Sequence, residues 1–194
     1  TYEWPVTDSY AKNTLASAAF ERAYNLAKIG KPVDRETWEM TPPTVNAYYS
    51  PQMNDINFPA GVLQPPLFDP KMDDAPGYGN TGGTIGHELI HGFDDEGRQF
   101  DAQGNLKNWW TPGDKKQFKQ RAQCIVDQYA KYVVVDNIKI NSQLTLGEDM
   151  ADLGGLVLAW MAWKVQTATV TPESRDGFTP EQRFFIGFAQ WACE

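Results

Sequence analysis

The chain has 194 residues and a formal net charge of −8. This length is enough for one domain with a buried core, and the negative charge argues against nucleic acid or an anionic membrane as a partner. No apolar run is long enough to cross a bilayer, so we expect no membrane contact by this segment. Two cysteines, Cys124 and Cys193, are too few for a disulfide framework.

The first part of the chain is predicted to form a helix and then a hairpin. Residues 8–29 carry an apolar stripe at helical spacing, and Asp8 or Ser9 can cap its start. Residues 45–49 and 55–58 are short and β-prone, with a Ser-Pro turn between them. We therefore expect two strands that pair as an antiparallel hairpin.

The middle of the chain is predicted to contain one helix between two loops. Residues 59–83 are rich in proline and glycine, which favours an ordered loop. A helix is expected to begin near Gly83 or Thr84 and to end near Phe93. The polar stretch 94–108 is expected to form turns.

Three further helices are predicted toward the C-terminus. Thr111 can cap a helix with Pro112 in its first position, and this helix should run to about Tyr132. Residues 146–166 form another long helical pattern, and a last helix opens at Thr179 with an aromatic stripe. These elements predict an α+β chain that is predominantly helical with a small sheet.

The pentapeptide His87-Glu88-Leu89-Ile90-His91 contains both histidines of the chain. Positions i and i+4 lie on one face of a helix, so His87 and His91 can bind one Zn²⁺ together. Glu88 is offset by about 100° from His87, which suits a general base that activates water better than a third ligand. The alternative is a buried helix that contains two histidines by chance.

A catalytic zinc site needs a third protein ligand, and no further histidine exists. The ligand is therefore expected to be a carboxylate. Glu148 and Asp152 share a helix face in a largely apolar segment, where two carboxylates would be costly without a metal or hydrogen-bond partners. The alternative is that both are solvated acids near a helix N-terminus.

Several segments in order resemble the neprilysin and endothelin-converting-enzyme family of zinc metallopeptidases, and the resemblance is closer to its bacterial members. The segments are residues 45–49, 58–66, 85–94, 109–111, 147–152 and 184–190. The resemblance covers nearly the whole chain. It implies a zincin, or thermolysin-like, metallopeptidase catalytic domain whose small sheet flanks the helix that carries the pentapeptide.

The resemblance also implies a role for each matching residue of the metal site. His87, His91 and Glu148 resemble the zinc ligands, and Glu88 resembles the residue that activates water. Asp152 and Asp94 are similar to the family aspartates that hydrogen-bond the two ligand histidines, a contact that fixes the imidazole tautomer.

Four more residues resemble substrate-binding positions of the family. Asn46 and Ala47 match the edge-strand positions that hold the substrate backbone, which agrees with the β-prone character of this segment. Val62 and Leu67 are similar to residues that line the apolar pocket after the scissile bond.

Compared with the family, residues 1–194 are expected to be a single partial catalytic domain. The family has a helical domain upstream and a C-terminal end that supplies a histidine and an arginine to catalysis, and neither is found here. We therefore expect the remainder of its own polypeptide to be a partner of this segment. Because the family partners of Cys124 and Cys193 are also missing, both cysteines are expected to be unpaired.

The expected function is that of a zinc-dependent endopeptidase that hydrolyses short peptides, with one Zn²⁺ per chain. One alternative is a fragment that binds zinc but is catalytically incomplete, and another is a metal-free helical interaction module. The resemblance implies an extracellular, periplasmic or membrane-anchored location, with a cytoplasmic one as the alternative.

Overall fold

The computed structural model describes residues 6–170 and 172–191, which fall into two compact units that divide between Trp38 and Glu39. The first unit contains helix α1 (Tyr10–Leu26). Its N-cap is Ser9, whose side chain accepts a hydrogen bond from the Lys12 backbone N–H at 3.4 Å. This confirms the helix predicted for this region. The assignment of the chain to a single domain remains a prediction.

The second unit begins with a two-stranded hairpin. Strands β1 (Tyr48–Ser50) and β2 (Asp55–Asn57) pair antiparallel, with Tyr49 opposite Ile56. The turn between them is closed by Asn54, which has a φ of +50°. The predicted hairpin is confirmed, but its paired residues begin at Tyr48, so the predicted substrate-binding residues 46–47 lie just before the strand.

A second hairpin was not predicted. Strands β3 (Val133–Val135) and β4 (Ile138–Lys139) pair antiparallel around a turn in which Asp136 has a φ of +50°. The β-branched run of valines followed by Asp136 and Asn137 is the signal for it in the sequence.

The helix that carries both histidines begins at Gly83, as predicted, but the residues before it are helical as well. A short helix α2 (Asp74–Gly77) and a π-helical turn η1 (Tyr78–Gly82) lead without a break into α3 (Gly83–His91). Residues 74–82 are therefore helical, and the loop predicted for 59–83 is wrong in this part. The reason is tertiary: a Cβ on Gly79 would lie 2.0 Å from the Phe184 carbonyl oxygen, so these small residues allow close packing on another helix.

The remaining helices match their predicted positions. Helix α4 (Pro112–Tyr129) begins with a capping box in which Thr111 and Asp114 bond reciprocally. Between α3 and α4, residues 97–99 form a short 3₁₀ turn, η2. Helix α5 spans Leu146–Gln166, and α6 spans Pro180–Trp191.

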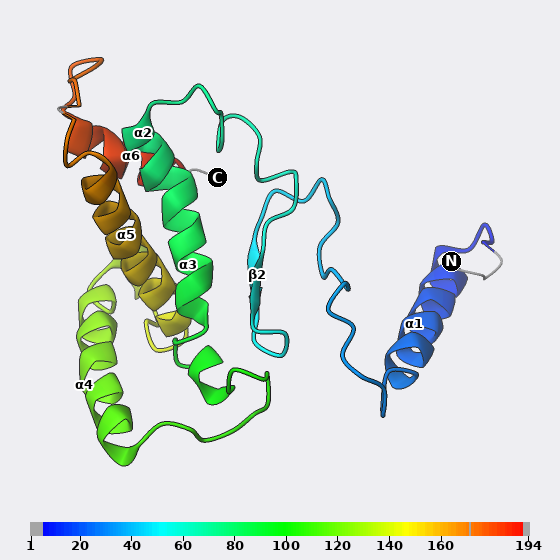
Figure 1. Cartoon of the computed structure of the whole chain (residues 1–194). Helices are drawn as coiled ribbons and strands as arrows, with labels where there is room; N and C mark the ends of the chain where they lie inside the picture. The colour runs from blue at the N-terminus through cyan, green and yellow to red at the C-terminus, as the bar shows by residue number, and fades with distance from the viewer. Residues whose placement is uncertain (1–5, 171, 192–194) are drawn as a thin grey trace. The chain divides into compact units, whose positions relative to one another are not determined.

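The core of the second unit lies where α2, α5 and α6 meet. Trp163 and Phe184 are fully buried there, and their rings stack with centroids 5.5 Å apart. Helix α3, which continues from α2 and η1, runs alongside α5 (Figure 1). This pairing brings the pentapeptide of α3 next to the first turn of α5. None of the described helices is both long enough and apolar enough to cross a membrane.

Candidate metal centre

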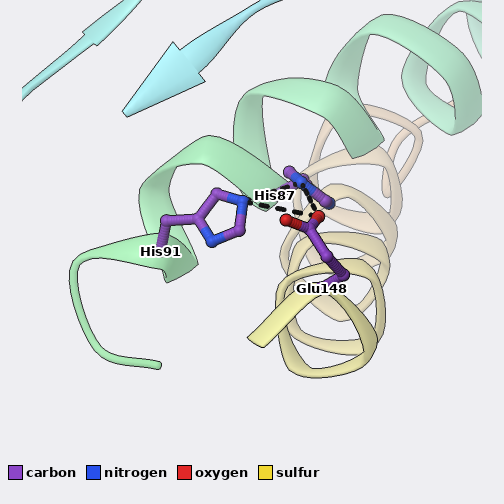
Figure 2. A group of neighbouring side chains, drawn as sticks. All are labelled: His87, His91 and Glu148. Carbon is purple, nitrogen blue, oxygen red and sulfur yellow. Dashed lines mark hydrogen bonds and ion pairs between the residues drawn. The ribbon is translucent and has the colours of Figure 1, made fainter. Parts of the chain in front are cut away.

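Two helices direct three potential ligand atoms toward one point. His87 and His91 are one turn apart on α3, and their Nε2 atoms are 2.9 Å apart. Oε2 of Glu148, from the first turn of α5, lies 3.3 Å from Nε2 of His87 and 3.7 Å from Nε2 of His91. Figure 2 shows the three side chains facing one another across the space between the helices.

The Nδ1 atom of each imidazole, on the side of the ring away from the converging Nε2 atoms, is hydrogen-bonded to an aspartate. Nδ1 of His87 lies 2.8 Å from Oδ1 of Asp152, and Nδ1 of His91 lies 2.7 Å from Oδ2 of Asp94. A carboxylate can only accept here, so each Nδ1–H donates to its aspartate. The lone pairs of the neutral rings are consequently on the two Nε2 atoms, which face each other.

Asp94 is itself fixed by the backbone that follows it. Its Oδ1 accepts hydrogen bonds from the N–H groups of Glu96 at 2.8 Å and Gly97 at 2.7 Å, and the residue is only 5% exposed. Although burial would raise the pKa of Asp94, the hydrogen bonds from His91, Gly97 and Glu96 outweigh it and lower the pKa. Asp94 is therefore an ionised anchor for His91.

The surrounding carboxylates make the centre attractive to positive charge. Burial alone would lower the pKa of His87, but hydrogen bonds to Asp152 and Glu148 outweigh it and raise the pKa to about 9. The pKa of His91 is also raised, because its hydrogen bond to Asp94 outweighs burial. The hydrogen bond from His87 lowers the pKa of Glu148. The negative charge of the carboxylates therefore stabilises positive charge on the two imidazoles.

Glu88 lines the same cleft as the three ligand atoms but is not one of the ligands, and its hydrogen-bond partner belongs to β1. Glu88 is 4% exposed. Burial raises its pKa, and this effect outweighs the charges of His87 and His91, which lower the pKa. The backbone N–H of Tyr49 in β1 donates a hydrogen bond to its carboxylate. A buried carboxylate with a raised pKa is suited to accept and return a proton.

The start of α5 is arranged so that Glu148 reaches the histidines. A Cβ on Gly147 would lie 3.1 Å from Oδ1 of Asp95 and 3.2 Å from Oδ2 of Asp94, so the loop after α3 lies against the first turn of α5. Thr145 donates a hydrogen bond from Oγ1 to Oδ2 of Asp149 at 2.9 Å, which orders this turn. Glu148 is thereby directed toward α3.

The three atoms open into a cleft of about 880 Å³. Its walls come from α3, from the segment 45–49, and from the end of α6, where Gln190 and Trp191 lie. Among the described residues that line the cleft, none is a lysine or an arginine. A cleft of this size fits an extended peptide segment or another small ligand.

Residues 46–194 match the sequence profile of Peptidase family M13. The chain belongs to this family. It is 45% identical to an endothelin-converting enzyme homolog of Locusta migratoria, over 96% of this chain and 26% of that protein. It is 44% identical to the human endothelin-converting enzyme-like 1, over 99% of this chain and 25% of that protein.

The solved structure of a zinc metalloprotease has a similar fold. The zinc metalloprotease ZMP1 of Mycobacterium tuberculosis, in complex with an inhibitor, superposes with a TM-score of 0.87 at 41% identity. The match covers 97% of this chain and 31% of that chain. The superposition confirms the predicted metallopeptidase fold. The chain spans about a quarter of the length of the curated relatives that it matches.

The residues of this M13 chain fit a zinc ion. Ligands about 2.1 Å from a tetrahedral zinc ion lie roughly 3.4 Å from one another, and the three ligand atoms here are 2.9, 3.3 and 3.7 Å apart. Because both Nδ1–H groups are donated to aspartates, the Nε2 atom of each ring is the one that can offer a lone pair to a metal once that ring is neutral. Two nitrogens and a carboxylate oxygen in this arrangement are a donor set that zinc accepts.

The structure brings most of the predicted site residues together. His87, His91, Glu148, Glu88, Asp94 and Asp152 surround one point, and Asn46, Ala47 and Leu67 line the same cleft. Val62 is buried and is not among the residues that line the cleft. Sequence reasoning did not single out Tyr49 or Gln190, because the signal for both is tertiary.

The two cysteines differ in what can be described. Cys124 on α4 is exposed and free, as predicted. Cys193 lies outside the described residues.

Proposed function

We propose that this chain carries the zinc site of an endopeptidase that hydrolyses short peptides, with His87, His91 and Glu148 as the zinc ligands and Glu88 as the general base. The observation that carries the proposal is the convergence of two Nε2 atoms and one carboxylate oxygen beside a buried glutamate, inside a cleft large enough for a peptide. Membership of peptidase family M13 supports the same reading.

Zinc, when bound, would supply a Lewis acid that lowers the pKa of water and polarises a peptide carbonyl. The chain's own contribution is proton transfer by Glu88. Its carboxylate takes a proton from the attacking water as the water oxygen bonds to the carbonyl carbon. It then delivers that proton to the amide nitrogen as the C–N bond breaks, so that the amine leaves neutral.

The peptide is proposed to lie along the free edge of β1. In the described part of the chain β1 pairs with β2 alone, so one edge of β1 carries no strand. The segment that leads into it, with Asn46 and Ala47, lines the cleft. An extended substrate can add to such an edge by main-chain hydrogen bonds. Leu67 provides an apolar wall for a substrate side chain.

The replacement Glu88→Gln tests the proposed base. Glutamine is nearly isosteric but cannot accept the proton, so zinc content should stay at one per chain while peptide hydrolysis falls by about 10²-fold or more. Glu21→Gln, an exposed position on α1, is the matched control and should change neither quantity. Full activity of Glu88→Gln would remove Glu88 from the mechanism.

A second candidate is a chain that binds zinc without turnover. The cleft, as far as the chain is described, contains no lysine or arginine and no histidine beyond the two proposed ligands. A charged donor for the developing oxyanion, whose loss costs about 10²–10³ in rate, is therefore missing from these walls. Zinc content of one per chain without chelator-sensitive cleavage of a quenched fluorescent peptide would favour this candidate.

The partners and location follow from the same reading. We propose oligopeptides as substrates and the remainder of its own polypeptide as the structural partner of this segment. We also propose an extracellular, periplasmic or membrane-anchored ectodomain location, supported by the relation to endothelin-converting enzymes.

A further inference from the structure

A second pocket, separate from the metal centre, is lined by positive charge. It lies where the turn η2 and the segment 106–110 meet the start of α4, and its volume is about 740 Å³. Its cationic residues are Arg98, Lys107, Lys115, Lys116 and Lys119. Among the described residues that line it, none is acidic, although the chain as a whole carries a net charge of −8.

Arg98 is held in a fixed orientation in this pocket. Its guanidinium carbon lies 4.5 Å from the ring centroid of Phe118 and 5.7 Å from that of Trp110. The carboxylate of Asp95 interacts with Arg98 electrostatically, but no ion pair joins Arg98 to an acid of the described chain. An arginine stacked in this way keeps its in-plane N–H groups available for an oxyanion.

Two hydrogen-bond donors in the pocket wall lack an acceptor. Nε of Arg98 and Nε1 of Trp110 are buried without a hydrogen-bond partner in the described structure. Oδ1 of Asp95, whose carboxylate interacts electrostatically with Arg98, is likewise buried without a hydrogen-bond partner. Arg98 Nε and Trp110 Nε1 can only donate, so a ligand that reached them would have to present an acceptor.

The positions of the lysines in α4 lower the stability of this helix. Lys115 and Lys119 are four residues apart on one face, where like charges repel by about 0.2–0.5 kcal/mol. Lys115 and Lys116 also follow directly after the first turn of α4, the end of a helix at which positive charge is unfavourable. Of the five cations, only Lys107 has an ion pair within the described chain, to Asp101 at 3.7 Å.

We propose that this pocket binds a compact polyanion that carries several sulfate or phosphate groups. The cations surround one concave pocket and do not form a long stripe, which favours a compact ligand over an extended chain such as nucleic acid. Glu96 and Gly97 line the metal-centre cleft, while the next residue, Arg98, lines this pocket. A ligand bound at Arg98 would therefore contact the turn that holds Asp94.

Isothermal titration calorimetry with two weakly chelating probes tests the proposal. Sucrose octasulfate represents the sulfate source and cyclic trimetaphosphate the phosphate source, and at least one should bind with a stoichiometry of one. Binding should weaken steeply between 50 and 200 mM salt, because several ion pairs contribute. The absence of binding of both probes at millimolar concentration would overturn the proposal.

Variants locate the binding site. The triple change Lys115→Gln, Lys116→Gln and Lys119→Gln should weaken binding by about tenfold or more and should not lower the melting temperature, since it relieves repulsion in α4. Arg98→Lys keeps the charge but loses the planar fork, and should weaken binding by about tenfold. The triple change Lys12→Gln, Lys31→Gln and Lys139→Gln, at exposed positions outside this pocket, is the control for the loss of three charges. Equal binding by the triple variant and the wild type would overturn the proposal.

Discussion

The backbones of Gly86 and Gly155 are in direct contact where α3 crosses α5. A Cβ on Gly86 would lie 2.6 Å from the carbonyl oxygen of Gly155, and a Cβ on Gly155 would lie 2.4 Å from the backbone nitrogen of His87. Any side chain at either position would push the helices apart. Because His87 and Glu148 come from opposite helices, this contact sets the distance between the proposed ligands.

Gly155→Ala should therefore damage both stability and the metal site. The added methyl group meets backbone atoms that cannot move aside, so we expect a loss of about 1–3 kcal/mol in the free energy of unfolding and at least a tenfold loss in zinc affinity. Urea unfolding and a competitive zinc titration measure the two effects. Gly113→Ala on α4 is the control, because its nearest neighbour would be a side-chain atom at 3.7 Å. Wild-type zinc affinity in Gly155→Ala would contradict this role of the crossing.

Substitutions of Asp94 and Asp152 should have similar effects on zinc affinity but different effects on the stability of the metal-free protein. Asp94→Ala and Asp152→Ala each remove the acceptor for one histidine Nδ1–H, so each should weaken zinc binding by about 10–100-fold. Only Asp94→Ala also leaves the buried N–H of Gly97 without its acceptor, which costs about 1–3 kcal/mol. The side chain of Asp152 is 45% exposed, so its loss should leave metal-free stability nearly unchanged. Thermal unfolding in the presence of chelator distinguishes the two variants.

Zinc should raise the melting temperature of the protein. The free energy of unfolding is expected to increase by about 2.7 kcal/mol at a free zinc concentration one hundred times the Kd. Calorimetry with zinc and then with chelator measures the change. Mg²⁺ at the same concentration should have no effect, because it prefers all-oxygen octahedral sites. A zinc response that persists in His91→Ala would place the metal elsewhere.

The aromatic core at the end of α5 is expected to support the cleft through α6. Phe184→Ala removes a side chain that is 0% exposed, and should cost about 3–5 kcal/mol in the free energy of unfolding. Phe185→Ala, one position along the same helix and 50% exposed, should cost much less. Equal destabilisation by the two changes, measured by urea unfolding, would show that the core is not centred on Phe184.

Local patterns were sufficient to predict most of the fold. Thr111 and Pro112 predicted the start of α4, because an N-cap and a proline in the first helical position depend only on residues close in sequence. The spacing of His87 and His91 predicted their shared face for the same reason. The four-residue spacing of Glu148 and Asp152 in an apolar segment selected this pair from the many acids, and the family resemblance indicated Glu148 as the ligand.

What the sequence did not predict depends on contacts between distant residues. Residues 74–82 contain proline and three glycines and have the composition of a loop, yet they are helical. Their small side chains allow α6 to approach, and this packing outweighs local propensity. In the same way, Gln190 and Trp191 reach the cleft only because α6 packs on α2, and no pattern near them indicates it.

Zinc K-edge X-ray absorption tests the central claim most directly, because it reports the ligands of the bound metal. One equivalent of zinc should show two imidazole nitrogens and a carboxylate oxygen at about 2.0–2.2 Å, with no sulfur near 2.3 Å. In Glu148→Gln the carboxylate oxygen should be lost from the spectrum, and zinc affinity should fall. A sulfur ligand, or a spectrum and affinity unchanged in Glu148→Gln, would contradict the assignment of His87, His91 and Glu148 as the metal centre.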